Sequence, residues 1–498
     1  MSLSTVDLDV LTAIIALLSP SDARSLSLTT RALYPAAQRH ALSTVVLDKP
    51  SKLSRAHEYL LADVPNRSHY IRKLTVTHQA LNSPSDDNVD DPLSAFFVQS
   101  ARLLADLLES TQLLTTISVA SMEQIIRAEP RVWNALTALS FLTNVELKDA
   151  HAGVLSRLGE FRGPLRKLEF CGSPDSYMLP GKLPFSQLVK AWCAYPRLQH
   201  IGLDYVPKVD YDRERLSSCT PCQTVLNLDV SHSELPLSGM TDMLPNLRSL
   251  SILNTKDYSE DNAGKCWSRL ARLDFRTQHG PSDSQHHWVI TSRTRQLVLL
   301  HSVETDPNRY WNFRHFYAST VEDAQPVALC LSTCPSVGED FWTGLVREGR
   351  RLRCLDIRLR AGWKCHKDVS EWLDKVPRFW TDSDLLYVRI FIRETDFLSR
   401  MNTSIPFRED DAAAMAYVKQ TVSAHLLACV PTVRLIAIKL MNETSWWRAQ
   451  QGGEGGPRHL VPISSDVGHH VETYLYSEEF EQSMVFDGEC TTMSGHLY

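Results

Sequence analysis

The stretch LRKLEF, from Leu165 to Phe170, carries a pattern that recurs along most of the chain, with apolar residues at its first, fourth and sixth positions. Its clearest other copies are LQHIGL (Leu198 to Leu203), LRSLSI (Leu247 to Ile252), LARLDF (Leu270 to Phe275) and LRCLDI (Leu352 to Ile357). Weaker copies extend the series from Ile71 to Leu440. Alternation of apolar and polar residues over so few positions is typical of a short strand with one buried face.

The copies recur at spacings that bracket, and often exceed, the roughly 20–29-residue period of leucine-rich repeats. One such repeat cannot bury its own apolar face, so neighbouring repeats must stack into a continuous core. Helix-like segments such as Leu93 to Ser110 and Ala412 to Cys429 fill the intervals. The predicted fold class is therefore α/β, with an irregular leucine-rich-repeat solenoid and a mainly parallel sheet over residues 49–440. We expect residues 441–498 to form a C-terminal cap or a flexible tail.

The composition is that of an ordinary soluble globular chain, with 43% hydrophobic and 22% charged residues. The formal net charge of −6 gives no electrostatic argument for nucleic acid as a partner. No stretch reaches the ~18 consecutive apolar residues of a membrane span, and the acidic N-terminus is a poor secretory signal. We therefore expect a cytoplasmic or nuclear protein without a membrane partner, whose eleven cysteines remain thiols.

Residues 1–48 differ from the repeats and predict a compact unit of three helices. Asp7 can cap a first helix from Leu8 to Leu18, and Ser19 with Pro20 can start a second one. A third helix is expected to begin near Thr30. The first helix has apolar residues on both faces: Leu8, Leu11, Ile15 and Leu18 on one, and Val10, Ile14 and Leu17 on the other. Such a helix must be covered on both sides.

This N-terminal segment resembles the F-box. The residues that match the family pattern are Leu8, Leu11, Ile14, Leu18, Ala23, Leu26, Leu28, Arg31, Leu33 and Tyr34. The usual opening Leu-Pro is Val6-Asp7 here, and Leu33-Tyr34 replaces the tryptophan that often follows the arginine. Followed by leucine-rich repeats, the segment looks like the start of an F-box and leucine-rich-repeat protein of the kind abundant in fungi.

The resemblance implies a substrate-receptor subunit of a cullin-RING (SCF-type) ubiquitin ligase. The F-box would bind a Skp-family adaptor, and through it the cullin, with the side chains of Leu8, Leu11, Ile14, Leu18, Leu28, Leu33 and Tyr34. The repeats would bind a protein substrate. The alternative is a non-catalytic repeat scaffold for protein–protein interaction, in which the N-terminal helices only cap the solenoid.

Catalytic and metal-binding motifs are missing from the sequence. It contains no GxSxG, GxxxxGK[ST], HExxH or GxGxxG motif. His286-His287 and His469-His470 are adjacent pairs, which on a strand point to opposite faces and suit one metal poorly. We therefore expect no catalytic residues, no metal and no cofactor, and a stand-alone enzyme is the least favoured function.

The polar residues of the repeated strands form two columns on the solvent-facing side of the predicted sheet. The residue between the last two core positions gives an acidic column, which includes Glu146, Glu169, Asp229, Asp274 and Asp356. Lys167 and Arg272 stand in the column beside it. We expect these seven residues to bind a basic or polar segment of the substrate. The alternative is a solvated sheet face whose charges neutralise each other.

Overall fold

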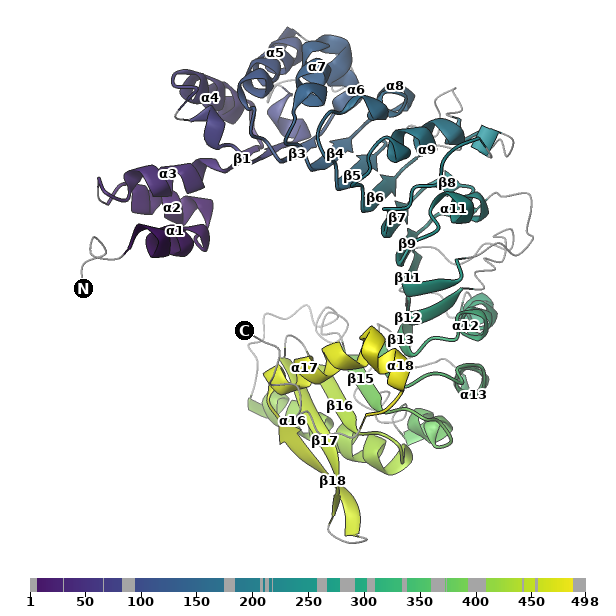
Figure 1. The fold of residues 1–498 in the computed structure, drawn as a ribbon. Helices are drawn as coiled ribbons and strands as arrows, with labels where there is room; N and C mark the ends of the chain where they lie inside the picture. The colour runs from purple at the N-terminus through teal and green to yellow at the C-terminus, as the bar shows by residue number, and fades with distance from the viewer. Residues whose placement is uncertain are drawn as a thin grey trace. The chain divides into compact units, whose positions relative to one another are not determined.

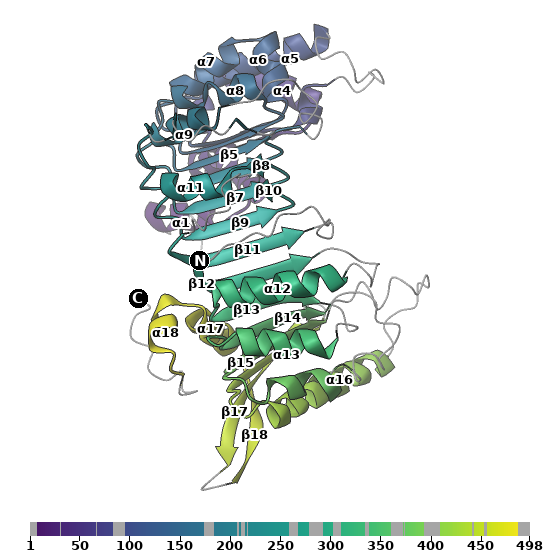
Figure 2. The same cartoon turned by 90° about the vertical axis from the view of Figure 1, so that its right-hand side faces the viewer.

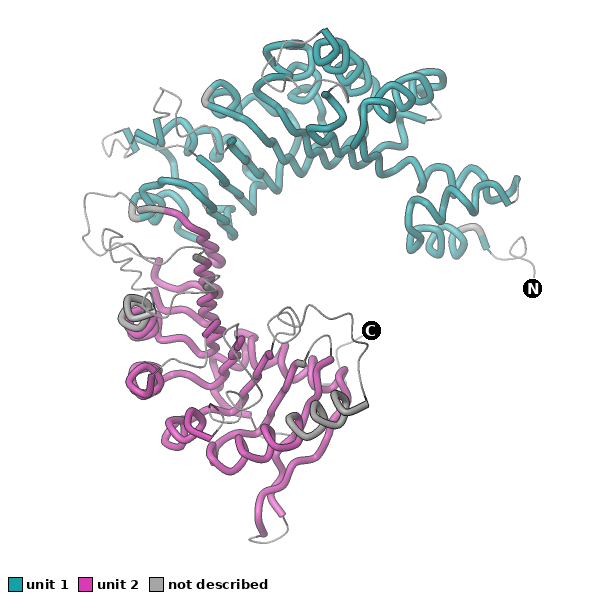
Figure 3. The backbone as a smooth tube through the Cα atoms, turned by 180° about the vertical axis from the view of Figure 1, so that it is seen from behind, with its two compact units in different colours: residues 1–246 teal, residues 247–498 magenta. Residues whose placement is uncertain are grey.

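The computed structural model describes residues 7–486 except for 30, 66, 83–94, 174–183, 207–208, 211–214, 217, 258–266, 278–291, 302–309, 334–337, 360–371, 373, 393–408, 441–442 and 453–455. The chain divides into two compact units, Met1–Asn246 and Leu247–Tyr498 (Figure 3). Both are mixed α/β with mostly parallel strands, an arrangement compatible with a repeat solenoid. No helix among the described residues combines the length and hydrophobicity that a membrane span requires.

Three short helices precede the first strand: α1 (Leu8–Ala16), α2 (Pro20–Ser27) and α3 (Tyr34–Leu42). The predicted caps are confirmed, since Asp7 accepts a hydrogen bond from the backbone N–H of Asp9 at 2.9 Å and Ser19 accepts one from Asp22 at 3.2 Å. The third helix begins later than predicted, at Tyr34. Proline is tolerated in the first turn of a helix but not in its interior, so Pro35 fixes this start.

Unit 1 contains a row of parallel strands in which neighbours in sequence are neighbours in space (Figure 1). The strands are β1 (Thr44–Leu47), β2 (Lys73–Val76), β3 (Thr116–Val119), β4 (Asn144–Lys148), β5 (Lys167–Cys171), β6 (His200–Asp204) and β7 (Asn227–Ser231), with a short β8 (Glu234–Leu235). The register aligns the repeated pattern, because Leu168 lies opposite Ile201 and Ile201 lies opposite Leu228. All three side chains are buried, so the pattern predicted both the strands and their alignment correctly.

The α-helices that follow these strands line one face of the row (Figures 1 and 2). They are α4 (Pro50–Leu61), α5 (Ala95–Ser110), α6 (Met122–Ala128), α7 (Arg131–Ala138), α8 (Ala152–Leu155), α9 (Phe185–Cys193) and α11 (Leu237–Met243). The connections also contain the short 3-10 helices η2 (Ser68–Tyr70), η3 (His78–Ala80) and η4 (Leu158–Glu160). In α5, Phe97, Leu104 and Leu108 are buried, as the amphipathic pattern predicted. Among the described residues of unit 1, no helix lies over the opposite face of β3–β7 (Figure 1).

Unit 2 continues the strand pattern, and its row of strands ends in an antiparallel hairpin. Its parallel strands are β9 (Ser249–Leu253), β11 (Arg269–Thr277), β12 (Arg293–His301), β13 (Ala328–Thr333), β14 (Cys354–Leu359), β15 (Tyr387–Ile392) and β16 (Leu435–Leu440), with a short β10 (Lys256–Asp257). They are followed by β17 (Glu443–Gly452), antiparallel to β16, and β18 (Gly456–Ile463), antiparallel to β17.

Helices lie on both faces of the sheet in unit 2. One face carries α12 (Tyr310–Ala324), α13 (Glu339–Glu348) and α16 (Glu409–Cys429), and the other carries α17 (Ser465–Leu475) and α18 (Glu478–Ser483) (Figures 1 and 2). The short helix η7 (Val376–Trp380) contacts α13 and α16. Successive residues of a strand point to opposite faces. Trp446 lies against Gly468 of α17, whereas Trp447 lines a groove with Ser423 and Ala424 of α16. The last described segment of the chain is therefore packed on the sheet face that the sequence assigned to a partner.

Candidate partner-binding surfaces

The three N-terminal helices have a small apolar core of their own. Leu11 and Ile15 of α1 are buried, together with Leu33 immediately before α3 and Ala37 within it. The ring nitrogen Nε2 of His40 in α3 lies 2.9 Å from the backbone carbonyl oxygen of Leu18 and joins the first helix to the third. These contacts make the segment a packed unit rather than three independent helices.

Among the described side chains of this N-terminal unit, five large apolar ones face solvent: Val10, Ile14, Leu17, Leu28 and Tyr34. Leu17 is 88% exposed and Leu28 is 80% exposed. Val10, Ile14 and Leu17 are spaced by four and three residues, so they lie on one face of α1 and its C-terminal end. Exposed apolar groups gathered on one small element usually mark an interaction site.

The predicted adaptor-binding residues divide into two groups in the structure. Ile14, Leu28 and Tyr34 are exposed and available to a partner, and Leu18 is half-buried. Leu11 and Leu33 are buried, so they hold the helices together and cannot contact an adaptor directly. The side chain of Leu8 lies outside the described residues. Val10 and Leu17 lie with Ile14 on the second apolar face of the helix, but only Ile14 of these three was among the expected adaptor contacts.

The uncovered sheet face of unit 1 carries the first part of the acidic column. The register places Glu146 opposite Glu169, Glu169 opposite Gly202, and Gly202 opposite Asp229 on the four strands β4–β7. The three carboxylates are all partly exposed. The structure therefore brings these predicted substrate-binding residues together on one accessible face, with Lys167 in the column beside them.

Each carboxylate of this face has a basic neighbour. Lys148 lies 3.0 Å from Glu146, and Lys167 lies 2.8 Å from Glu169. His200 lies between two carboxylates, with its Nε2 atom 3.6 Å from Glu169 and 3.4 Å from Asp229. The His200 ring lowers the pKa of the Glu169 carboxyl, and Lys167 adds to this effect against the opposing influence of burial. The face is thus a mixed polar surface rather than an uncompensated acidic stripe.

Gly202 determines where the Glu169 side chain can lie. A Cβ atom at position 202 would come within 2.9 Å of Cγ of Glu169. This distance is too short for two carbon atoms, so only glycine lets the Glu169 stem cross the neighbouring strand. Glycine in a strand interior often marks such a close approach.

A third polar row lies where the strands end. Asp149, Tyr205 and His232 directly follow β4, β6 and β7, and each has a positive φ, of 51°, 50° and 44°. Nδ1 of His232 lies 3.0 Å from Asp204, and its ring stacks on Tyr205 with centroids 4.5 Å apart. These residues were not among the predicted contacts. Their sequence signal is position alone, because each follows one copy of the repeated pattern.

In unit 2 the acidic column is not available as the sequence predicted. Asp274 is 2% exposed and pairs with Arg272 at 3.2 Å and Arg276 at 2.8 Å. Asp356 is also 2% exposed and pairs with Arg389, which in turn pairs with Glu472 of α17. The expectation that Asp274 and Asp356 face solvent is therefore wrong, because local arginines and a C-terminal helix cover them. Arg272 remains partly exposed.

The C-terminal helices bury the columns that follow Asp274. Cys354, Tyr387 and Leu435 occupy one register row of β14–β16 and are fully buried. They form an apolar cluster with Val471 and Leu475 of α17, and the cluster also includes Trp446 of β17 and Phe480 of α18. Within unit 2 the columns are therefore closed to a partner from Cys354 to Leu435, whereas Arg272 and the columns of unit 1 remain accessible.

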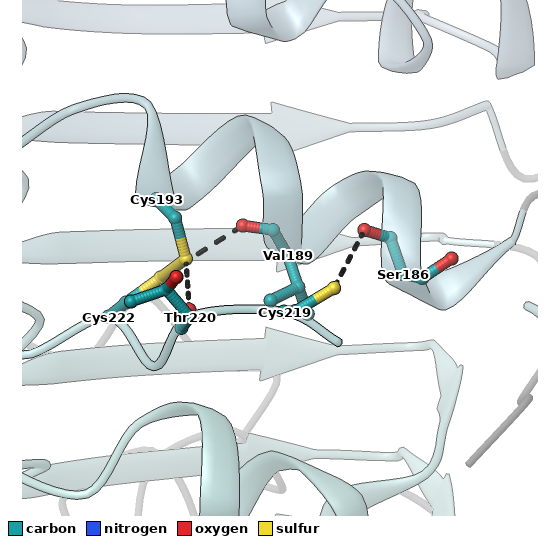
Figure 4. Close-up of a disulfide and its surroundings, with 6 residues drawn as sticks. All are labelled: Ser186, Val189, Cys193, Cys219, Thr220 and Cys222. Carbon is teal, nitrogen blue, oxygen red and sulfur yellow. Dashed lines mark hydrogen bonds between the residues drawn. A yellow bond between two sulfur atoms is a disulfide. The ribbon is translucent and has the colours of Figure 1, made fainter. Parts of the chain in front are cut away.

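The cysteine prediction also needs correction. Cys193, the last residue of α9, forms a disulfide with Cys222 in the segment before β7, with Cα atoms 5.2 Å apart (Figure 4). Cys222 does not pair with Cys219, which stands three positions before it in the sequence and whose sulfur lies 4.0 Å from the carbonyl oxygen of Ser186. The separation of 29 residues is about one repeat period, which places the two cysteines in adjacent repeats.

Metal-binding geometry is absent from the described part of the chain. There, no group of three or more His, Cys, Asp or Glu side chains is arranged to hold a metal ion. The His286-His287 pair lies outside the described residues. His469 packs edge-on against Trp446, with ring centroids 5.1 Å apart.

Comparison with known proteins gives little further information. No family model matches the chain, and no curated protein sequence matches it either. Among solved structures, the chain is similar to a chain in the crystal structure of the Rad7 and Elc1 complex of yeast, with a TM-score of 0.30 and 11% sequence identity. The similarity covers 83% of this chain and 99% of that chain. A likeness this low identifies no family, so functional conclusions depend on the surfaces described above.

Proposed function

We propose that this protein is a non-enzymatic substrate receptor of an SCF-type cullin-RING ubiquitin ligase, acting in the cytoplasm or nucleus. The observation that carries the proposal is the set of exposed apolar side chains on α1–α3, Leu17 and Leu28 above all, on a helical unit with its own core. In this role the helices bind a Skp-family adaptor, which links the chain to the cullin, and the repeats bind a protein substrate.

Docking on α1–α3 would be driven by burial of apolar surface. Covering a leucine side chain that is otherwise exposed contributes roughly 1.5–3 kcal/mol. Leu17 and Leu28 are the two most exposed large apolar residues of the described chain. Together they supply a large share of the binding energy that a specific complex of two proteins requires.

The substrate surface in this proposal is the uncovered face of unit 1. Its carboxylates Glu146, Glu169 and Asp229 alternate with Lys148, Lys167 and His200, so a substrate segment meets both signs of charge. Complementary charges at such a face contribute specificity and association rate more than affinity. The chain itself supplies proximity and orientation to the ubiquitin-transfer reaction, and no chemical group.

The test is adaptor capture by the full-length chain. The double variant Leu17→Asp/Leu28→Asp should bind a purified Skp-family adaptor at least about 100-fold more weakly, which corresponds to a loss of about 3 kcal/mol. The matched control is Phe141→Asp, an equally disruptive change at a residue of unit 1 that is also exposed, and it should leave capture unchanged. Absence of adaptor binding by the unaltered chain would refute the proposal.

A second function is supported by the contacts of α3 with the rest of unit 1. The guanidinium of Arg39 lies over the ring of Tyr70, 5.2 Å from its centroid, and Gln38 donates a hydrogen bond to the hydroxyl of Tyr59 at 3.2 Å. These contacts suit a non-catalytic repeat scaffold whose first helices cap the solenoid. In that case the Leu17→Asp/Leu28→Asp variant keeps every partner, and deletion of residues 1–42 destabilises unit 1.

A further inference from the structure

We infer that the open groove between α16 and the β17–β18 hairpin binds a short peptide segment of another protein that combines apolar side chains with carboxylates. α16 contacts both strands of the hairpin, and Figure 2 shows the helix beside them. The groove has a volume of about 930 Å³, within the range that is typical of ligand pockets. The inference concerns unit 2 alone, so it is independent of adaptor binding by α1–α3.

The walls of the groove are mostly apolar and are reached by water. Leu427 of α16, Trp447 of β17 and Leu460 of β18 line it and are half-buried. Pro462 lines it as well and is exposed, and the register places this residue opposite Trp447. Partly exposed tryptophan in a concave surface is a frequent centre of binding energy in protein complexes. An apolar anchor from a partner would therefore gain by covering these side chains.

The charges of the groove have one sign. Among the described residues that line it, Lys419 and Arg458 are cationic, and none is Asp or Glu. Lys419 has a carboxylate partner, Glu443, whose oxygen lies 2.9 Å from its Nζ atom. Glu443 is not a lining residue and its side chain is 80% exposed, so most of its charge is solvated by water. The groove therefore presents positive charge to whatever enters it.

Arg458 has no carboxylate partner within the described part of the chain. Its guanidinium donates hydrogen bonds to the backbone carbonyl oxygens of Pro431 at 2.6 Å and Val430 at 3.3 Å, and also to that of Val433. Carbonyl groups satisfy N–H donors but bring no net charge. Burial, together with nearby Arg434, lowers the pKa of Arg458 below its ordinary value. A carboxylate that enters the groove would supply the missing countercharge.

The placement of the two cations favours a peptide over a lipid surface. The Lys419 side chain is only 18% exposed, and Arg458 is held against the turn that follows α16, so neither extends far into solvent. Binding to a lipid surface requires basic side chains that surround a projecting apolar face. A peptide segment can instead enter a groove between secondary-structure elements. The expected segment thus carries a leucine or aromatic anchor close to Asp or Glu.

The test measures binding of the full-length chain to a labelled synthetic peptide in which glutamate pairs alternate with leucine pairs. Ala424 of α16 lies in the groove and is exposed, so a larger side chain there changes the groove without entering the core. Ala424→Gln and Ala424→Glu add side chains of equal size that differ in charge. The Ala424→Glu chain should bind at least about tenfold more weakly than the Ala424→Gln chain, because its carboxylate repels those of the peptide. The matched control is Thr421→Glu, at an exposed position of α16 outside the groove, and it should leave binding unchanged.

Two further peptides separate the charged from the apolar contribution. Lysine in place of every glutamate should remove measurable binding, and alanine in place of every leucine should weaken binding at least about tenfold. Failure of the unaltered chain to bind the glutamate–leucine peptide, or equal affinities of the Ala424→Gln and Ala424→Glu chains, would overturn the inference. Binding to phosphatidylserine vesicles in place of the peptide, removed by Ala424→Glu, would assign the groove to a membrane and overturn it as well.

Discussion

Replacing Arg389 by methionine should destabilise unit 2 strongly. Asp356 is 2% exposed and Glu472 is 13% exposed on its side chain, so the substitution leaves two carboxylates facing each other with little access to water. Removal of one member of a buried ion-pair network typically costs about 3–5 kcal/mol, because the remaining charges lose their compensation. Methionine fills most of the space of the arginine stem, so the loss reflects charge rather than a cavity.

The assay is urea denaturation of the full-length chain, followed by the fluorescence of the buried tryptophans of unit 2, among them Trp342 and Trp446. The matched control is Arg347→Met, whose exposed side chain pairs with its neighbour Glu348. This change should alter the free energy of unfolding by less than about 1 kcal/mol. Addition of Asp356→Asn and Glu472→Gln to the Arg389 variant should recover most of the loss. A drop of less than about 1 kcal/mol for Arg389→Met would refute the view that this network is desolvated.

Three further outcomes are expected. Burial raises the pKa of Glu481, but the hydrogen bonds from Arg269 and Arg351 outweigh burial and hold this pKa below its ordinary value of 4.5. The Glu481 carboxylate therefore stabilises the docked α18 above pH 4.5, and this stabilisation is lost as the pH falls through the lowered pKa. Hydrogen exchange of α18 should rise in acid, and Glu481→Gln should remove this pH dependence. Loss of the Cys193–Cys222 disulfide, by reduction or by serine substitution, should lower the free energy of unfolding of unit 1 by about 3–4 kcal/mol, and reductant should have no effect on the serine variant. Gly202→Ala should lower the free energy of unfolding of unit 1 by about 1 kcal/mol, because the added Cβ atom collides with the Glu169 side chain, although alanine ordinarily stabilises a strand relative to glycine. Adding Glu169→Ala to this variant should restore the lost stability, as measured by urea titration.

Local pattern was enough to predict the strands and their register. The alternation around Leu168, Ile201 and Leu228 reflects burial on one face of each strand, and this is a property of a few neighbouring residues. The caps formed by Asp7 and Ser19 were predictable for the same reason, because each involves residues two or three positions away.

The accessible part of the predicted site could not be found from local pattern. Asp356 has the same strand position as Glu169, yet its exposure is decided by α17, whose Glu472 follows more than a hundred residues later. Likewise, the partner of Cys222 is not the nearby Cys219 but a cysteine of the previous repeat. Leu11 and Ile14 are apolar residues one helical turn apart, so the sequence does not distinguish them. Only the packing of α1 against the other helices decides that Leu11 is buried and Ile14 is exposed.

The antiparallel hairpin that ends the row of strands in unit 2 limits how the sheet can be extended, either by another molecule or by added repeats. β18 is the last strand in the described order of the sheet, and its sequence contains Pro457 and Pro462. Proline has no N–H to donate, so a strand that carries two of them is a poor template for a strand from another molecule. The protein is thereby protected against end-to-end polymerisation through this edge. Lengthening of the array by duplication of repeats is confined to positions before the hairpin, where every new parallel strand finds a partner on both sides.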